Sequence, residues 1–270
     1  MHRSPHAKRP SVLAGTWYPE EPEALFGQVD QLLKQARSEG ASSAHQPTAL
    51  IVPHAGMSYS GPTAAHAFAS VRERPKRILL LGPSHRLRFR GISAGLFSYY
   101  CSPVGDFPVD VDAINSLLEA GAVQANPEAH DQEHCLEMML PFIGTRWGSI
   151  PILPLLVGHS SPHHIQQVLE HIFSPGDLIC VSSDLSHFLT YAEARERDLQ
   201  TLESIRTGRW EALGPEDACG CTPIAGLIQF SRRRHLICSV LDYRNSGDTA
   251  GNRERVVGYG ALAYRTTDSG

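Results

Sequence analysis

The stretch ALIVPHAG, residues 49–56, is a short apolar run that ends in a proline, a histidine and a glycine. A continuous apolar run of this length predicts a strand that is buried on both faces, as in a parallel sheet covered by helices. The pattern returns at RILLLGPSH, residues 77–85, and at DLICVSSDLSH, residues 177–187. Three predicted strands of this chain therefore end close to a histidine.

Helical periodicity separates these strands and defines the fold class. Further strands are expected at residues 92–100, 150–157, 235–243 and 256–265, and helices at residues 22–38, 63–71, 111–119, 136–143, 163–172, 192–206 and 222–234. Alternating strands and helices predict an α/β fold, a single domain with a mostly parallel central sheet flanked by helices. We expect this domain to cover residues 11–270, after a disordered N-terminal arm over residues 1–10.

Composition excludes several classes of function. The formal net charge of −4 argues against binding to nucleic acid or to a membrane surface, which usually requires a basic excess. No apolar stretch approaches the roughly 20 residues of a membrane-spanning helix. Six cysteines are scattered through a chain long enough to form a core, which favours a reduced, cytoplasmic protein.

The histidines at the strand ends are the first candidates for chemistry. In open α/β sheets, ligands bind beyond the carboxyl ends of the strands, where His54, His85 and His187 are expected. Imidazole binds Fe, Cu, Zn and Ni, and two histidines with an anionic third ligand are common in redox iron sites. Alternatively, each histidine is a hydrogen-bonded structural residue, and the unknown strand order leaves this alternative open.

Two other segments carry possible site residues. In DQEHCLE, residues 131–137, the acids are explained as a first helical turn that complements the helix dipole, but His134 is not, so His134 is a site candidate. Cys219 and Cys221 precede a predicted helix. A thiolate at a helix N-terminus is a better nucleophile or metal ligand, although two inert thiols would give the same pattern.

Taken together, the motifs resemble those of the MEMO family. The resemblance rests on seven stretches that cover nearly the whole chain: AGTWYP at 14–19, PHAGMSYSG at 53–61, GPSHR at 82–86, EHCLEMMLPF at 133–142, SSDLSHF at 182–188, CGCTPI at 219–224 and GYGALAY at 258–264. It implies a fold like that of the class III extradiol ring-cleaving dioxygenases. It also implies partners of two kinds, an AMMECR1-like protein and a radical-SAM protein.

The resemblance further implies a metal site in a surface cleft, with His54, His85 and Cys219 as the ligands. Asp184 and His187 would lie beside the metal, with His187 as general acid or base and Asp184 orienting it. His134 matches the histidine of the family's EHS-type motif and is assigned to the catalytic group. Fe(II) is the expected metal, with Cu(I) or Zn as alternatives, because a thiolate ligand is softer than a carboxylate.

Three functions are compatible with these residues. The first is a mononuclear non-haem iron or copper redox protein with a dioxygenase-like site, acting on a small molecule. The second is a non-enzymatic protein that binds a metal or a peptide in the same cleft. The third is a zinc hydrolase, because two histidines, a cysteine and a water also form a catalytic zinc set.

Overall fold

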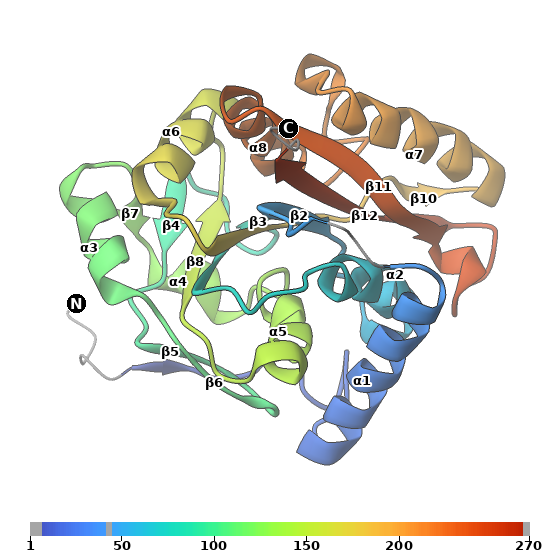
Figure 1. Ribbon diagram of the computed structural model, residues 1–270, viewed down its shortest axis with the longest axis horizontal. Coiled ribbons are helices and arrows are strands. Elements are labelled where there is room, and N and C mark those ends of the chain that lie inside the picture. The colour runs from blue at the N-terminus through green and yellow to red at the C-terminus, as the bar shows by residue number, and fades with distance from the viewer. Residues whose placement is uncertain (1–6, 42–44, 267–270) are drawn as a thin grey trace.

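The computed structural model describes residues 7–41 and 45–266, and a nine-stranded sheet runs through the middle of the molecule (Figure 1). Its strands follow the order β10-β12-β2-β9-β3-β8-β4-β7, with β11 also paired to β12. Their bounds are β2 Ala49–Val52, β3 Arg77–Pro83, β4 Ile92–Ala94, β7 Gln124–Ala125, β8 Ile152–Val157, β9 Asp177–Ser182, β10 His187–Leu189, β11 Leu236–Asn245 and β12 Val256–Thr266.

Helices cover both faces of this sheet, which confirms the predicted α/β domain. On one side α1 (Pro22–Ser38), α2 (Met57–Ala69) and α5 (Leu140–Trp147) pack together. On the other side α6 (Pro162–Ile172) packs against α8 (Cys221–Arg233) and α3 (Val111–Glu119), while α7 (Tyr191–Arg206) lies on β11 and β12. A short helix, α4 (Pro127–Asp131), leads into the histidine-rich loop. Within the described ranges, no helix has the length and apolar character needed to cross a membrane.

The sheet is parallel at its centre and mixed toward its margins, where β7 is parallel to β4 and the other pairs are antiparallel. Strands β2, β9, β3 and β8 are parallel, and every residue of β2, β8 and β9 is buried. Strand β12 runs antiparallel to β2, and β4 antiparallel to β8. The continuous apolar runs therefore identified the parallel core, as expected for strands covered on both faces.

Several sequence-based boundaries differ from the structure, and the helix expected from residue 63 begins at Met57. The strand expected over residues 92–100 is broken after β4, where Leu96 has a φ of 51° and turns the chain. The chain then enters a second sheet, formed by β1 (Lys8–Arg9), β5 (Tyr99–Ser102) and β6 (Gly105–Pro108). The helix expected from residue 136 begins as a 3₁₀ turn at Glu137–Met139, and α5 starts at Leu140, where Pro141 fits the first turn.

The N-terminal boundary also differs. Residues 1–6 of the expected disordered arm lie outside the described residues, but Lys8 and Arg9 pair with Tyr99 and Tyr100 of β5. Arg9 is buried. A short basic segment resembles a solvated arm in sequence, and only the tertiary structure supplies the partners that bury it.

The parallel strands end at one edge of the sheet and bring the histidines together. Val52 of β2 lies opposite Ser182 of β9, and Pro83 of β3 lies opposite Val157 of β8. The residues that follow these strand ends therefore meet at the carboxyl edge, where open α/β sheets bind ligands.

Candidate metal centre

Three imidazoles converge at the carboxyl edge of the sheet. His54 follows β2, His85 follows β3, and His134 lies between α4 and the 3₁₀ turn that precedes α5. One ring nitrogen from each histidine lies within 4.8 Å of the other two. The ring centroids are 5.1 Å apart for His54 and His85, 5.3 Å for His54 and His134, and 4.4 Å for His85 and His134. This donor set suits a transition metal.

Glu133 orients two of these histidines. Its Oε1 accepts a hydrogen bond from Nδ1 of His85 at 2.9 Å and lies 3.1 Å from Nδ1 of His134. The backbone N–H groups of His85 and His134 also donate to this carboxylate, at 2.6 and 3.0 Å. With Nδ1 turned toward a carboxylate, each ring keeps Nε2 for a metal.

Burial favours the protonated form of Glu133, but hydrogen bonds from His134 and His85 outweigh it and hold the pKa of the carboxyl well below its usual range. The expectation that the acids of residues 131–137 serve a helix dipole is therefore wrong for Glu133. The sequence feature that could have identified Glu133 is its position directly before His134, which was already a site candidate.

His54 is buried and held in its neutral form. Its Nδ1 lies 2.8 Å from Ser182 Oγ, and that hydroxyl donates its proton to the carbonyl of Cys135 at 2.7 Å. Ser182 Oγ therefore accepts from Nδ1–H, which leaves the Nε2 lone pair for a ligand bond. Burial lowers the pKa of His54 well below its ordinary value, and the charges of His134 and His85 lower it further. Neutral imidazole is the form that binds metals.

Cys219 lies next to His54 but outside the three-imidazole group. Its Sγ is 3.5 Å from His54 Nε2 and accepts a hydrogen bond from the backbone N–H of Asp184 at 3.3 Å. Bond lengths at a tetrahedral zinc place its nitrogen and sulfur ligands about 3.6 Å apart, so the two atoms are spaced to share a metal. Burial raises the pKa of the Cys219 thiol to about 12, and the charge of Asp184 adds to this effect.

Asp184 and His187 lie on the next part of the edge. Asp184 is buried, and its Oδ1 accepts the backbone N–H of His54 at 2.7 Å. Burial raises the pKa of its carboxyl, and the His54 N–H opposes this rise. His187 is partly exposed on β10, and within residues 7–41 and 45–266 no hydrogen bond joins its side chain to Asp184. The electrostatic effect of His187 nevertheless reaches both His54 and Asp184.

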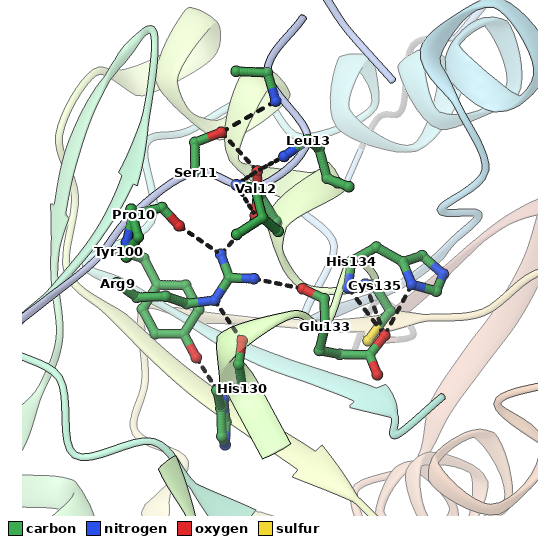
Figure 2. Close-up of polar contacts among 12 residues, drawn as sticks. Arg9, Pro10, Ser11, Val12, Leu13, Tyr100, His130, Glu133, His134 and Cys135 are labelled. Atoms are coloured by element: carbon green, nitrogen blue, oxygen red, sulfur yellow. Dashed lines mark hydrogen bonds and ion pairs between the residues drawn. The ribbon is translucent and has the colours of Figure 1, made fainter. Parts of the chain in front are cut away.

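An N-terminal segment, residues 9–18, holds the loop that carries Glu133 and His134. Figure 2 shows the Arg9 guanidinium inserted among backbone carbonyls of this loop. It donates to the carbonyl of His130 at 2.7 Å, to the carbonyl of Glu133 at 2.6 Å and to the carboxylate of Glu137 at 2.6 Å. Sequence reasoning did not find Arg9 or Glu137, because a buried ion pair between residues so distant in sequence leaves no local pattern.

Glu137 secures the same segment from the other side. It is fully buried, and its carboxylate accepts hydrogen bonds from Ser11 Oγ, Val12 N, Leu13 N and Tyr18 Oη as well as from Arg9. The Trp17 ring packs 4.8 Å from the His134 ring. The backbone carbonyl of Trp17 accepts the N–H of Met57, close to His54. The segment thus contacts two of the loops that supply histidines.

The fold and the site define an α/β protein with a cluster of histidines at the carboxyl edge of its sheet that could hold a metal ion. Residues 9–263 match the family described as Memo-like protein, and the chain belongs to that family. It is 33% identical to a MEMO1 family protein of Aeropyrum pernix, over 92% of this chain and 96% of the other. MEMO1 family proteins of Aquifex aeolicus and Desulfurococcus amylolyticus are 30% and 29% identical, each over 95% of this chain and over 98% and 99% of the relatives.

Among solved structures, the chain is similar to an uncharacterized protein from Escherichia coli K12. The TM-score is 0.48 at 12% sequence identity, over 79% of this chain and 99% of the other.

Proposed function

We propose that this chain binds one redox-active transition-metal ion, iron first and copper next, with His54, His85 and Cys219 as ligands. The observation that carries the proposal is the set of oriented imidazoles, with His54 in its neutral form, beside a thiol whose Sγ lies 3.5 Å from His54 Nε2. Glu133 and Ser182 lie at the Nδ1 side of the histidine rings and leave the Nε2 atoms of the rings free. Histidines with a purely structural role would not require this arrangement. Because the Cys219 thiol has a pKa of about 12, metal binding would release its proton.

The remaining residues provide positioning and proton transfer. An iron or copper ion held here would supply Lewis-acid and one-electron chemistry to a small molecule in the cleft. His187, partly exposed at the same edge, is the group we assign to proton transfer with that molecule. Asp184 fixes the backbone of His54 and carries charge near His187. The association with AMMECR1-like and radical-SAM proteins stays a prediction.

A zinc hydrolase is a second candidate, and the three-imidazole group favours it. Ring nitrogens of His54, His85 and His134 lie within 4.8 Å of one another, and three histidines with a water form a catalytic zinc site. In this alternative His134 replaces Cys219 as the third ligand. The two ligand sets share His54 and His85, so the identity of the third ligand, Cys219 or His134, distinguishes the two candidate functions.

Metal titration of the anaerobically reduced protein tests the proposal. We expect about one Fe(II) or Cu(I) per chain, as a one-site design requires. Binding should be lost in His54→Ala and His85→Ala and retained in His163→Ala, a control at an exposed histidine of α6. Loss in Cys219→Ser with retention in His134→Ala supports the thiolate site, and the reverse supports the zinc alternative. Unchanged binding in His54→Ala and His85→Ala would rule out both.

Turnover is tested separately. The metal-loaded protein is supplied with a panel of diols, and oxygen consumption is recorded for the wild type and for His187→Gln. Consumption that depends on His187 supports the redox enzyme. A protein that binds the metal but consumes no oxygen across the panel is instead the non-enzymatic metal- or peptide-binding protein.

A further inference from the structure

A pocket of about 300 Å³ adjoins the metal centre at the carboxyl edge of the sheet. Its walls come from three segments that lie between residues 83 and 89, 157 and 159, and 215 and 223. Cys219 forms part of the wall, and Ser84 directly precedes His85. One end of the pocket therefore borders the proposed metal ligands.

Backbone contacts hold the pocket open in a defined shape. The N–H of Ser84 donates to the carbonyl of Val157 at 3.0 Å, and the N–H of His159 donates to the carbonyl of Phe89 at 2.8 Å. Gly158 permits this close approach, because a Cβ atom at that position would lie 2.3 Å from the Phe89 carbonyl oxygen. The wall formed by the loop after β3 is thus fastened to the end of β8. A site of fixed shape binds a small ligand without the cost of ordering a loop.

The lining combines an apolar surface with positive charge. Leu87, Phe89 and Val157 supply apolar area, and the side chains able to carry positive charge are those of Arg88 and His159. Among the residues that the structure describes, no aspartate or glutamate lines the pocket, although acidic residues outnumber lysine and arginine by 28 to 24 in the whole sequence. Across residues 7–41 and 45–266, no carboxylate forms an ion pair with Arg88. A guanidinium without a partner at an apolar pocket favours an anionic ligand.

We propose that this pocket is the substrate subsite and that it takes a small molecule with an apolar body and one carboxylate group. Arg88 binds the carboxylate, the apolar side chains contact the body of the molecule, and the end nearest Cys219 faces the metal. The orientation toward the metal rests on the proposed function. The preference for an anion does not, because it follows from Arg88 and the lining alone.

NMR titration with benzoate and with benzamide tests the proposal, because the two probes differ chiefly in charge. A charge-assisted hydrogen bond from an arginine predicts that benzoate binds about 10-fold or more tightly than benzamide. The preference should fall to within about threefold in Arg88→Gln and persist in Arg90→Gln, a control at an exposed arginine of the same loop that does not line the pocket. Both substitutions are at exposed positions and leave the core intact.

The titrations are run on metal-free and on metal-loaded protein, which separates the two proposals. If the protein fails to bind metal but still prefers benzoate to benzamide, the subsite proposal stands and the proposed metal-binding function is rejected. Equal affinity for the two probes in the wild type, or an unchanged preference in Arg88→Gln, would overturn the subsite even if the metal binds.

Discussion

Removal of the Arg9 side chain tests how the N-terminal segment supports the metal centre. Arg9 is 1% exposed and Glu137 0%. In Arg9→Met, Glu137 keeps its hydrogen bonds from residues 11–18 but loses the cation beside it. The carbonyls of His130 and Glu133 lose their donor as well. Removing one partner of a buried ion pair costs about 3–5 kcal/mol, and we expect the free energy of unfolding to fall by that amount.

The assay is chemical denaturation of metal-free protein at neutral pH, with Arg9→Met, Glu137→Gln and the double variant. Glutamine keeps an oxygen that accepts hydrogen bonds but carries no charge. In the Arg9→Met background it therefore removes an unpaired buried charge, and the double variant should lose less stability than the two single variants added together. We expect this coupling to exceed about 1 kcal/mol, as for residues in direct contact.

The same variants connect the ion pair to the site. Arg9 binds the backbone carbonyl of Glu133, whose carboxylate orients His85 and His134. Folded Arg9→Met should therefore bind metal more weakly than the wild type. A loss of less than about 1 kcal/mol, with strictly additive effects in the double variant, would refute the reasoning, because a solvated arm would behave in that way.

Three further predictions address individual side chains. Glu133→Gln should weaken metal binding by about 10- to 100-fold in a chelator-competition titration, which is the usual effect of removing an orienting carboxylate. The control Glu128→Gln, at an exposed position, should leave the metal affinity unchanged, and equal metal affinities of Glu133→Gln and the wild type would contradict the role of Glu133. Burial lowers the pKa of His130 to about 3, so protonation of this histidine favours the unfolded chain. The stability that neutral His130 contributes is complete above the unfolded pKa of about 6.5 and is lost as the pH falls toward 3. Between pH 6 and pH 4, the wild type should therefore lose about 1 kcal/mol per pH unit more than His130→Gln in urea denaturation, and parallel slopes would show that His130 is not buried as the neutral base. Gly158→Ala should cost about 1–3 kcal/mol and abolish the preference for benzoate, because its Cβ would meet the Phe89 carbonyl at 2.3 Å, whereas Gly27→Ala, with nothing within 4 Å, should do neither.

The strand ends of the site were predictable because their pattern is local. Apolar runs that stop at His54 and at His85 identified two parallel strands, and parallel strands of a buried sheet end at one edge. The sequence left the strand order open. The structure supplies it by placing β9 between β2 and β3, which brings both histidines to one place.

The supporting residues were not predictable in the same way. Glu133 has the sequence context of a helix start, and its role depends on the neighbouring strand that delivers His85. Arg9 lies in a basic stretch and becomes a buried ion-pair partner only when β1 joins β5. Ser182 looks like the last residue of a strand, but its hydroxyl fixes the proton of His54 on Nδ1. Each of these roles depends on long-range contacts that residue type and spacing do not encode.

The most direct test of the metal centre is a crystal structure of anaerobically reduced, Fe(II)-loaded protein, with the ion located by its anomalous scattering. We predict a single ion at about 2.0–2.3 Å from Nε2 of His54, Nε2 of His85 and Sγ of Cys219, since metal bonds to imidazole and thiolate have these lengths. An ion bound elsewhere, or bound without contact to His54 and His85, would contradict the proposed function.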